Sequence, residues 1–369
     1  MDILEALGAP FQHKSLNLAN RFVMAPMTRQ FAPDGAPTTD MADYYRRRAE
    51  GGVGLIISEG VGLDRLSSRN MSRIPKFHGR EPLAGWARIL EGVHQAKGAM
   101  APQLWHVGGV PDFYEPSTET DGLESPSGLI GPNLPGGRPM TQEDIADVVA
   151  SFGRAAADAK RLGFDAIEVH AAHGYLIDQF FWSETNRRSD RFGGPTVQDR
   201  ARFGADVVRE LRKAVGSELA LILRVSQWKT NFYETKIARD PGELELWLGP
   251  LASAGVDIFH CSQRRFWEPE FPGSDLNLAG WVKKAIGTPT ITVGSIGLSR
   301  DVMSDFGGGE SLVNLGSLQE LARRFERGDF DLAAIGRPLL ADPDWLLKIR
   351  AGRFEALSSY AMDASKLLY

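Results

Sequence analysis

Two histidines and a tyrosine stand within six residues of one another, at His170, His173 and Tyr175. They follow the apolar run 164–169, which has the composition of a buried parallel strand, so we predict that they begin a loop at the end of that strand. Two imidazoles and a phenol offer several hydrogen-bond donors to one small polar group. The pattern predicts a site that clamps a substrate oxygen and holds a proton donor beside it.

The rest of the chain alternates between short apolar runs, typical of strands, and longer amphipathic patterns, typical of helices. Strands are predicted at 21–27, 53–59, 100–106, 164–169, 219–226, 256–261, 289–293 and 331–335, and helices at 38–50, 82–97, 141–162, 197–215, 242–254, 278–286, 318–327 and 343–351. Eight such repeats predict a (β/α)8 barrel, with an N-terminal lead-in, formed by a single domain of residues 1–369. The alternative is an open doubly wound sheet, which wants a glycine-rich turn after the first strand, and residues 25–29 are not one.

A Pro- and Gly-rich segment, 107–140, separates the third predicted strand from the next helix. Unstructured loops of this length are uncommon in compact domains unless they serve a function. We therefore expect this segment to form a cap over the active face of the barrel.

The composition excludes several classes of protein. The 42 basic and 47 acidic side chains give a net charge of -5, which argues against a nucleic-acid partner. Cys261 is the only cysteine, which excludes disulfide frameworks, iron–sulfur clusters and cysteine-rich zinc sites. The N-terminus does not resemble a signal peptide and no apolar stretch has the length of a membrane span, so we expect a cytoplasmic protein with no membrane partner.

In a barrel of this type the residues just past each strand share one face, and active sites lie on that face. The predicted strand ends are rich in hydrogen-bonding groups: Pro26, Met27, Thr28, Glu59, Gly60, Gln103, Trp105, His106, His170, His173, Tyr175, Arg224, residues 262–265, Gly294, Ser295, Gly336 and Arg337. The paired acids of glycoside hydrolases are absent. Only His106 is placed to join the histidine pair as a zinc ligand. The set suits a flat, polar, anionic ligand better.

A phosphate site is predicted after the seventh and eighth strands, where barrels often bind phosphate. Gly294 and Ser295 follow the seventh strand, and Gly336 and Arg337 follow the eighth. Glycine lets backbone N–H groups approach a phosphate, and an arginine binds one with two parallel hydrogen bonds. The simpler alternative is a pair of ordinary turns.

Five motifs resemble the old yellow enzyme family and occur in the family's order, at residues 24–29, 103–106, 170–176, 189–194 and 335–339. That family consists of FMN-dependent NAD(P)H oxidoreductases that reduce activated alkenes. The resemblance spans nearly the whole chain. It implies tightly but non-covalently bound FMN, NADPH or NADH as hydride donor, and an enone or nitroalkene as the small-molecule substrate.

The resemblance also implies a set of cofactor contacts. Thr28 matches the residue that bonds the flavin C4 carbonyl, Gln103 the one at the pyrimidine edge, and Arg224 the arginine near the N1–C2 carbonyl region. Further contacts to the ring or the phosphate are implied for Pro26, Met27, Gly60, His170, Gly294, Ser295, Gly336 and Arg337. The segment 298–316 is longer than the family pattern, and we expect it to displace a phosphate contact.

On the substrate side, His170 and His173 match the pair that grips the carbonyl or nitro oxygen, and Tyr175 matches the proton donor to the α-carbon. Trp105, Arg264 and Trp267 are further candidates for substrate contact. The leading hypothesis is an ene-reductase in which NAD(P)H reduces the flavin and leaves before the alkene binds.

Three other functions remain open at this stage. A reductase of nitro-esters or quinones would use the same fold and the same oxygen clamp. A metal-dependent barrel hydrolase would use His170 and His173 as ligands, whereas the leading hypothesis needs no metal. A flavin-binding protein without catalysis is the third. Monomer, dimer and tetramer are left open, so a homo-oligomer is retained among the partners.

Overall fold

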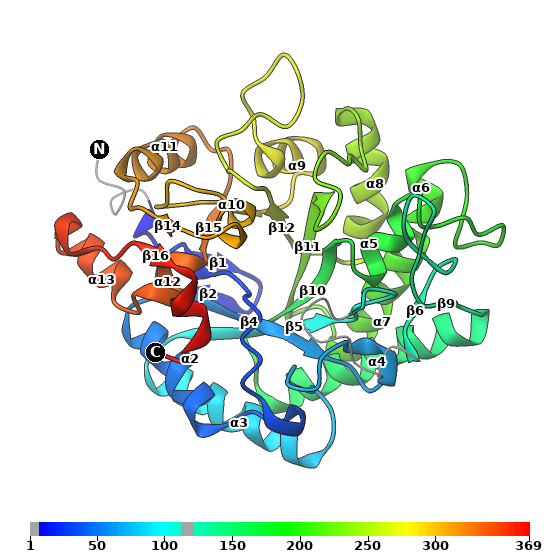
Figure 1. The fold of residues 1–369 in the computed structure, drawn as a ribbon, viewed down its shortest axis with the longest axis horizontal. Helices are drawn as coiled ribbons and strands as arrows, with labels where there is room; N and C mark the ends of the chain where they lie inside the picture. Colours follow the sequence, from blue (N-terminus) through cyan, green and yellow to red (C-terminus); the bar gives the residue numbers. More distant parts are fainter. Residues whose placement is uncertain (1–6, 112–121) are drawn as a thin grey trace.

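The computed structural model describes residues 7–111 and 122–369, and its centre is a closed barrel of eight parallel strands (Figure 1). The strands are β3 (Phe22–Met24), β4 (Leu55–Gly62), β5 (Ala99–Trp105), β10 (Ala166–His173), β11 (Ala220–Lys229), β12 (Ile258–Ser262), β13 (Thr290–Val293) and β15 (Leu332–Ile335). Strand β15 pairs with β3 and so closes the barrel. The predicted (β/α)8 barrel is confirmed, and the open-sheet alternative is wrong.

Helices alternate with the strands and surround the barrel (Figure 1). They are α2 (Thr39–Glu50), α3 (Arg80–Gln95), α4 (Gln142–Leu162), α5 (Leu176–Phe181), α6 (Val197–Arg200), α7 (Arg202–Val215), α8 (Pro241–Ala254), α9 (Leu278–Ile286), α10 (Val302–Phe306), α11 (Leu315–Glu326), α12 (Arg337–Ala341) and α13 (Trp345–Arg350). The short helices α5, α10 and α12 were not predicted, because so few turns give no clear periodicity. In the described part of the chain, no helix combines the length and the apolar character needed to span a membrane.

The N-terminal lead-in forms a small antiparallel hairpin of β1 (Phe11–His13) and β2 (Leu16–Leu18). The side chains of Phe11, Leu16 and Leu18 are buried in one cluster with inward-facing residues of the barrel strands. The hairpin is anchored to the barrel beside the start of β11, since the Ser15 hydroxyl donates a hydrogen bond to the carbonyl of Glu218, just before that strand. It therefore covers the end of the barrel at which the strands begin, opposite the predicted site.

Strand β10 extends further than the sequence predicted. The expected strand ended at residue 169, yet β10 continues to His173, so His170 lies within the strand and not in a loop. The extension is supported by β11, which also runs on to Lys229 and pairs His173 with Lys229 after a register shift. His173 adopts a positive φ of 65° at this irregularity, and such bulges re-aim side chains at the rims of barrels.

The expected cap over the barrel is described only in part, since residues 112–121 lie outside the described ranges. The described part contains two small sheets, one pairing β6 (Glu124–Ser125) with β9 (Arg138–Pro139) and the other pairing β7 (Leu129–Gly131) with β8 (Leu134–Pro135). Val110 and Ile130 from this region line a cavity at the carboxyl ends of the barrel strands. The cap as a whole stays a prediction.

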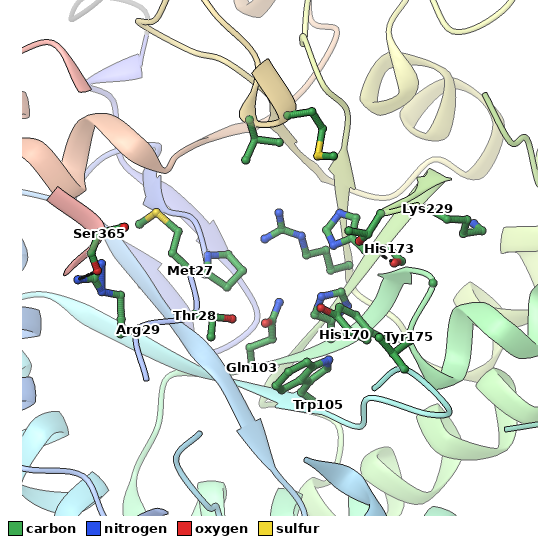
Figure 2. Close-up of a pocket in the computed structure, with 18 of the residues that line it drawn as sticks. Met27, Thr28, Arg29, Gln103, Trp105, His170, His173, Tyr175, Lys229 and Ser365 are labelled. Atoms are coloured by element: carbon green, nitrogen blue, oxygen red, sulfur yellow. Dashed lines mark hydrogen bonds between the residues drawn. The ribbon is translucent and has the colours of Figure 1, made fainter. Parts of the chain in front are cut away.

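The C-terminal segment packs against α2 and against the segment that follows β3. Strand β16 (Tyr360–Ala361) pairs with β14 (Glu310–Ser311). Beyond it, Arg29 donates from Nη2 to the carbonyl of Ser365 at 3.0 Å (Figure 2). Arg47 of α2 donates in the same way to the carbonyl of Leu368 at 2.6 Å.

Candidate active site

A cavity of about 700 Å³ opens among the carboxyl ends of the barrel strands (Figure 2). Its walls include most of the predicted site residues: Pro26, Met27, Thr28, Gly60, Gln103, Trp105, His170, His173, Tyr175, Arg224 and Arg337. Figure 2 shows Met27 and Thr28 on one side of the cavity and His170, His173 and Tyr175 on the other. The barrel therefore brings together residues that are far apart in the sequence.

Arg224 is a buried cation that lines this cavity. It lies on β11 between His170 of β10 and His260 of β12, which are its register partners. Only 7% of the residue is exposed, and its Nε and Nη1 atoms have no hydrogen-bond partner among the described residues. Burial lowers the pKa of Arg224, although the charge of Glu168 raises it. Because an unpaired buried guanidinium is costly, these atoms point to an acceptor supplied by a ligand.

Beneath the cavity, Glu168 joins two of its neighbours in a buried network. Its Oε1 accepts from Nε2 of Gln103 at 2.8 Å, and its Oε2 lies 2.6 Å from Nδ1 of His260. The network fixes the amide orientation of Gln103. Sequence reasoning missed Glu168 and His260, although a charged residue inside an apolar strand was the available signal.

His170 is a neutral hydrogen-bond donor. Burial and the nearby charge of Arg224 hold the pKa of His170 well below its usual value. The backbone N–H of Ala172 donates to Nδ1 of His170, so in the neutral ring the proton resides on Nε2. The ring centre lies 5.0 Å from that of Tyr175 and 5.1 Å from that of His173, both nearly perpendicular. The three predicted groups therefore do form one cluster.

His173 is held by Ser262, one of the strand-end residues named from the sequence, and by Trp228, which the sequence did not single out. Its Nε2 lies 2.8 Å from the hydroxyl oxygen of Ser262 on β12, and its ring packs against that of Trp228 at a tilt of 32°, with centres 4.3 Å apart. The indole N–H of Trp228 donates to the carbonyl of Ser262. Burial, followed by the charge of Arg224, lowers the pKa of His173 well below its usual value. His173 is therefore a second neutral imidazole with a fixed ring.

The half-buried Tyr175 stands at the start of α5, and a buried ion pair supports its turn. The N–H of Gly174 donates to one oxygen of Asp178 at 2.6 Å, and Nζ of Lys229 donates to the other at 2.8 Å. Burial raises the pKa of Asp178 and lowers that of Lys229. Because each charge is matched inside the protein, the pair fixes the turn that carries Tyr175. Neither member was predicted from the sequence.

Across the cavity, Glu59 holds the segment that carries Thr28. Its Oε2 accepts from the backbone N–H groups of Arg29 at 2.9 Å and of Gln30 at 3.3 Å. Burial raises the pKa of Glu59 to about 7, against the lowering effect of these two hydrogen bonds. The neighbouring Gly60 is required by a close approach, since a Cβ there would lie 2.9 Å from the ring of Trp105.

At the predicted phosphate site, Arg337 already has protein partners. Its Nη1 pairs with the carboxylate of Asp305, and its Nη2 donates to the carbonyl of Arg300 at 2.9 Å and to the hydroxyl of Ser295 at 3.3 Å. Gly294 and Gly336 adjoin these residues but, like Ser295, are not among those that line the cavity. The residues of the predicted phosphate site therefore lie close together, and Asp305 lies among them.

Two candidates for substrate contact lie elsewhere. Arg264 binds Asp301 at 3.2 Å and lies over the ring of Tyr233, and Trp267 packs edge-on against Phe266. Neither lines the cavity, because ion pairing holds the first and packing against the core holds the second. Within residues 7–111 and 122–369, no group of three or more His, Cys, Asp or Glu side chains is placed to hold a metal ion.

The sequence matches one protein family over most of its length. The model of the NADH:flavin oxidoreductase / NADH oxidase family matches residues 6–355. An NADH oxidase of Thermoanaerobacter brockii is 32% identical over 354 residues, which is 92% of this chain and 50% of that protein. A metal reductase of Desulforamulus reducens is 32% identical over 96% of this chain and 50% of its own length. The chain thus spans about half the length of these two relatives.

Other relatives match along most of both chains. A chanoclavine-I aldehyde reductase of Penicillium roqueforti is 30% identical over 94% of this chain and 89% of that protein. The structure of morphinone reductase in complex with tetrahydroNAD superposes with a TM-score of 0.79 at 27% identity, covering 98% of this chain and 94% of that one. The old yellow enzyme homologue of Zymomonas mobilis, 24% identical over 98% of this chain and 96% of its own, shares the fold with a TM-score of 0.77. The chain belongs to the NADH:flavin oxidoreductase / NADH oxidase family, as the old yellow enzyme resemblance had indicated.

Proposed function

We propose that this protein is an FMN-dependent NAD(P)H oxidoreductase that reduces the C=C bond of α,β-unsaturated carbonyl or nitro compounds. The observation that carries the proposal is the convergence of two neutral imidazoles and a phenol on one side of the cavity, opposite Met27 and Thr28. We also propose that residues 1–369 form one FMN-binding domain.

The cavity fits FMN best at the end that would receive the flavin ring. The Nε and Nη1 atoms of Arg224, which have no partner among the residues that the structure describes, supply donors for ring acceptors, and Gln103 and Thr28 supply further polar contacts. The other ring contacts and the phosphate contacts of the proposal are Pro26, Met27, Gly60, His170, Gly294, Ser295, Gly336 and Arg337. When bound, FMN would supply the hydride chemistry of the reaction, with NAD(P)H as the hydride source and the β-carbon of the alkene as the acceptor.

The protein's own side chains form the substrate clamp. The N–H at Nε2 of His170 donates to the substrate's carbonyl or nitro oxygen, with His173 as the second contact. Donors fixed in this way stabilise the negative charge that develops on that oxygen as the β-carbon accepts hydride. Tyr175 then gives its hydroxyl proton to the α-carbon as a general acid. NAD(P)H and the alkene occupy the same cavity in turn.

A visible absorbance spectrum of the purified protein tests this proposal. We expect a flavin spectrum that bleaches on anaerobic addition of NADPH or NADH and returns on addition of cyclohexenone. The two coenzymes added separately establish the preferred hydride donor. A colourless protein that stays colourless after incubation with FMN would contradict the proposal and direct attention to metal analysis. Flavin that neither coenzyme reduces would support a binding protein without catalysis.

A further inference from the structure

Asp305 is a buried acid at the phosphate end of the cavity. It lies on α10, lines the cavity, and has a side chain that is only 2% exposed. Its Oδ2 pairs with Nη1 of Arg337, while its Oδ1 has no hydrogen-bond partner among the described residues. An acid beside the arginine that is expected to hold a phosphate is a conflict of charge, because both anions need the same guanidinium.

The other arginines of this region are directed elsewhere. Arg300 donates to the carbonyls of Ser304 at 2.5 Å and Gly308 at 2.8 Å, and its Nε lies 3.8 Å from Asp305. Arg265 is paired with Asp301 at 2.6 Å, as Arg264 is at 3.2 Å. Unlike Arg337, none of these three arginines lines the cavity. Arg29 also lines the cavity, but it donates to the carbonyls of Ser365 and Leu367. A phosphate beside Arg337 therefore meets a guanidinium that a carboxylate already shares.

We propose that Asp305 determines the flavin selectivity of this protein, by competing with the phosphate of FMN for Arg337. The inference rests on the proposed function. Riboflavin carries the same ring and ribityl chain as FMN but no phosphate, so it leaves the pair of Asp305 and Arg337 intact. Contacts at the ring end, including Arg224, serve both flavins equally. We expect the wild-type protein to bind FMN no more than about tenfold more tightly than riboflavin, a difference of about 1.4 kcal/mol.

Titration of the flavin-free protein with each flavin tests the proposal without any assay of activity. Quenching of flavin fluorescence gives the two dissociation constants, and their ratio is the measured quantity. Asp305→Asn removes the charge at nearly constant shape, and we expect it to raise the ratio by roughly tenfold or more, through tighter FMN binding alone. Glu310→Gln is the matched control, because Glu310 is an exposed acid of β14 in the same segment.

Asp305→Ser provides a second variant in case the asparagine still engages Arg337 or fails to fold. A ratio unchanged in both folded variants would overturn the proposal, as would an equal change in the affinities for FMN and riboflavin. A wild-type ratio of about a thousand or more would also overturn it, since Arg337 would then bind phosphate unhindered. Failure of wild-type protein to bind either flavin would instead overturn the proposed function, and this inference with it.

Discussion

The arginines at the two ends of the cavity differ in whether they have protein partners. At the ring end, Arg224 is buried with Nε and Nη1 unpaired among the described residues. At the phosphate end, Arg337 is bonded to Asp305, Ser295 and the carbonyl of Arg300. A cation without a protein partner makes the folded protein less stable and the complex more stable, whereas a paired cation does the reverse. How much a buried arginine contributes to flavin binding therefore depends on the partners that it already has in the folded protein.

The largest effect is expected on the rate of alkene reduction, at the side of the cavity where the substrate is proposed to bind. Tyr175→Phe should lower the rate of alkene reduction by roughly 100- to 10,000-fold, because the general acid is lost. Reduction of the flavin by NADPH should be nearly unchanged, since that step needs no proton from Tyr175. Anaerobic stopped-flow absorbance measures the two half-reactions separately. If the variant reduced cyclohexenone as fast as the parent, the proton-donor role would be wrong for that substrate.

Substituting each arginine by methionine compares the two ends directly. Arg224→Met should weaken both FMN and riboflavin by roughly 10- to 150-fold, the value of a hydrogen bond to a buried charge. Arg337→Met should weaken FMN by less than about tenfold and leave riboflavin unchanged, because Asp305 already engages that guanidinium. Fluorescence titration measures all four affinities. Equal losses of FMN affinity in the two variants would remove the contrast between the ends.

Arg224→Met should also affect stability in the opposite direction from binding. In the flavin-free protein, the variant should unfold at a temperature no lower than the parent, since it removes an unpaired buried charge. Thermal unfolding followed by circular dichroism checks this, and a much lower unfolding temperature would show that Arg224 has a structural role.

A smaller effect is expected at Ser262, which contacts the ring of His173. Ser262→Ala removes one hydrogen bond, worth about 0.5–1.5 kcal/mol, so the alkene half-reaction should slow by roughly two- to tenfold. Ser262→Thr keeps the hydroxyl and should restore the rate. A positioning role predicts that NADPH still reduces the flavin at the parental rate, whereas a general loss of structure would slow both half-reactions together.

The last expected effect is on stability and not on catalysis, and it concerns Glu59, whose pKa is raised by burial to about 7. In the unfolded chain, Glu59 releases its proton near its usual pKa, which is lower than 7. Between these two pKa values the folded protein binds more protons than the unfolded chain, so it loses stability as the pH rises through 7. Between pH 6 and 8 the wild type should lose about 1.4 kcal/mol of unfolding free energy relative to Glu59→Gln. Urea unfolding of both proteins at the two pH values measures this difference, and parallel curves would show that Glu59 does not titrate there.

The sequence was sufficient for the barrel and for the strand-end residues of the cavity wall, because strand periodicity and the rule that barrel sites lie at strand ends are local signals. It was insufficient for contacts that depend on register. Ser262 meets His173 across 89 positions of sequence, and His260 meets Glu168 across 92. Arg264 shows the converse limit, since Asp301, the residue that caps the unpredicted helix α10, binds it away from the cavity.

The wall of the cavity joins residues 26–30, which follow β3, to Tyr360, Met362 and Ser365 near the other extreme of the chain. Closure of the barrel between β3 and β15 likewise joins distant segments, and Arg21 bonds the carbonyl of Asp331 across 310 positions. Contacts so remote in sequence form slowly during folding. A refolding chain should therefore acquire flavin only when the barrel closes, so that cofactor capture marks the completion of the fold and a stalled, open chain is colourless.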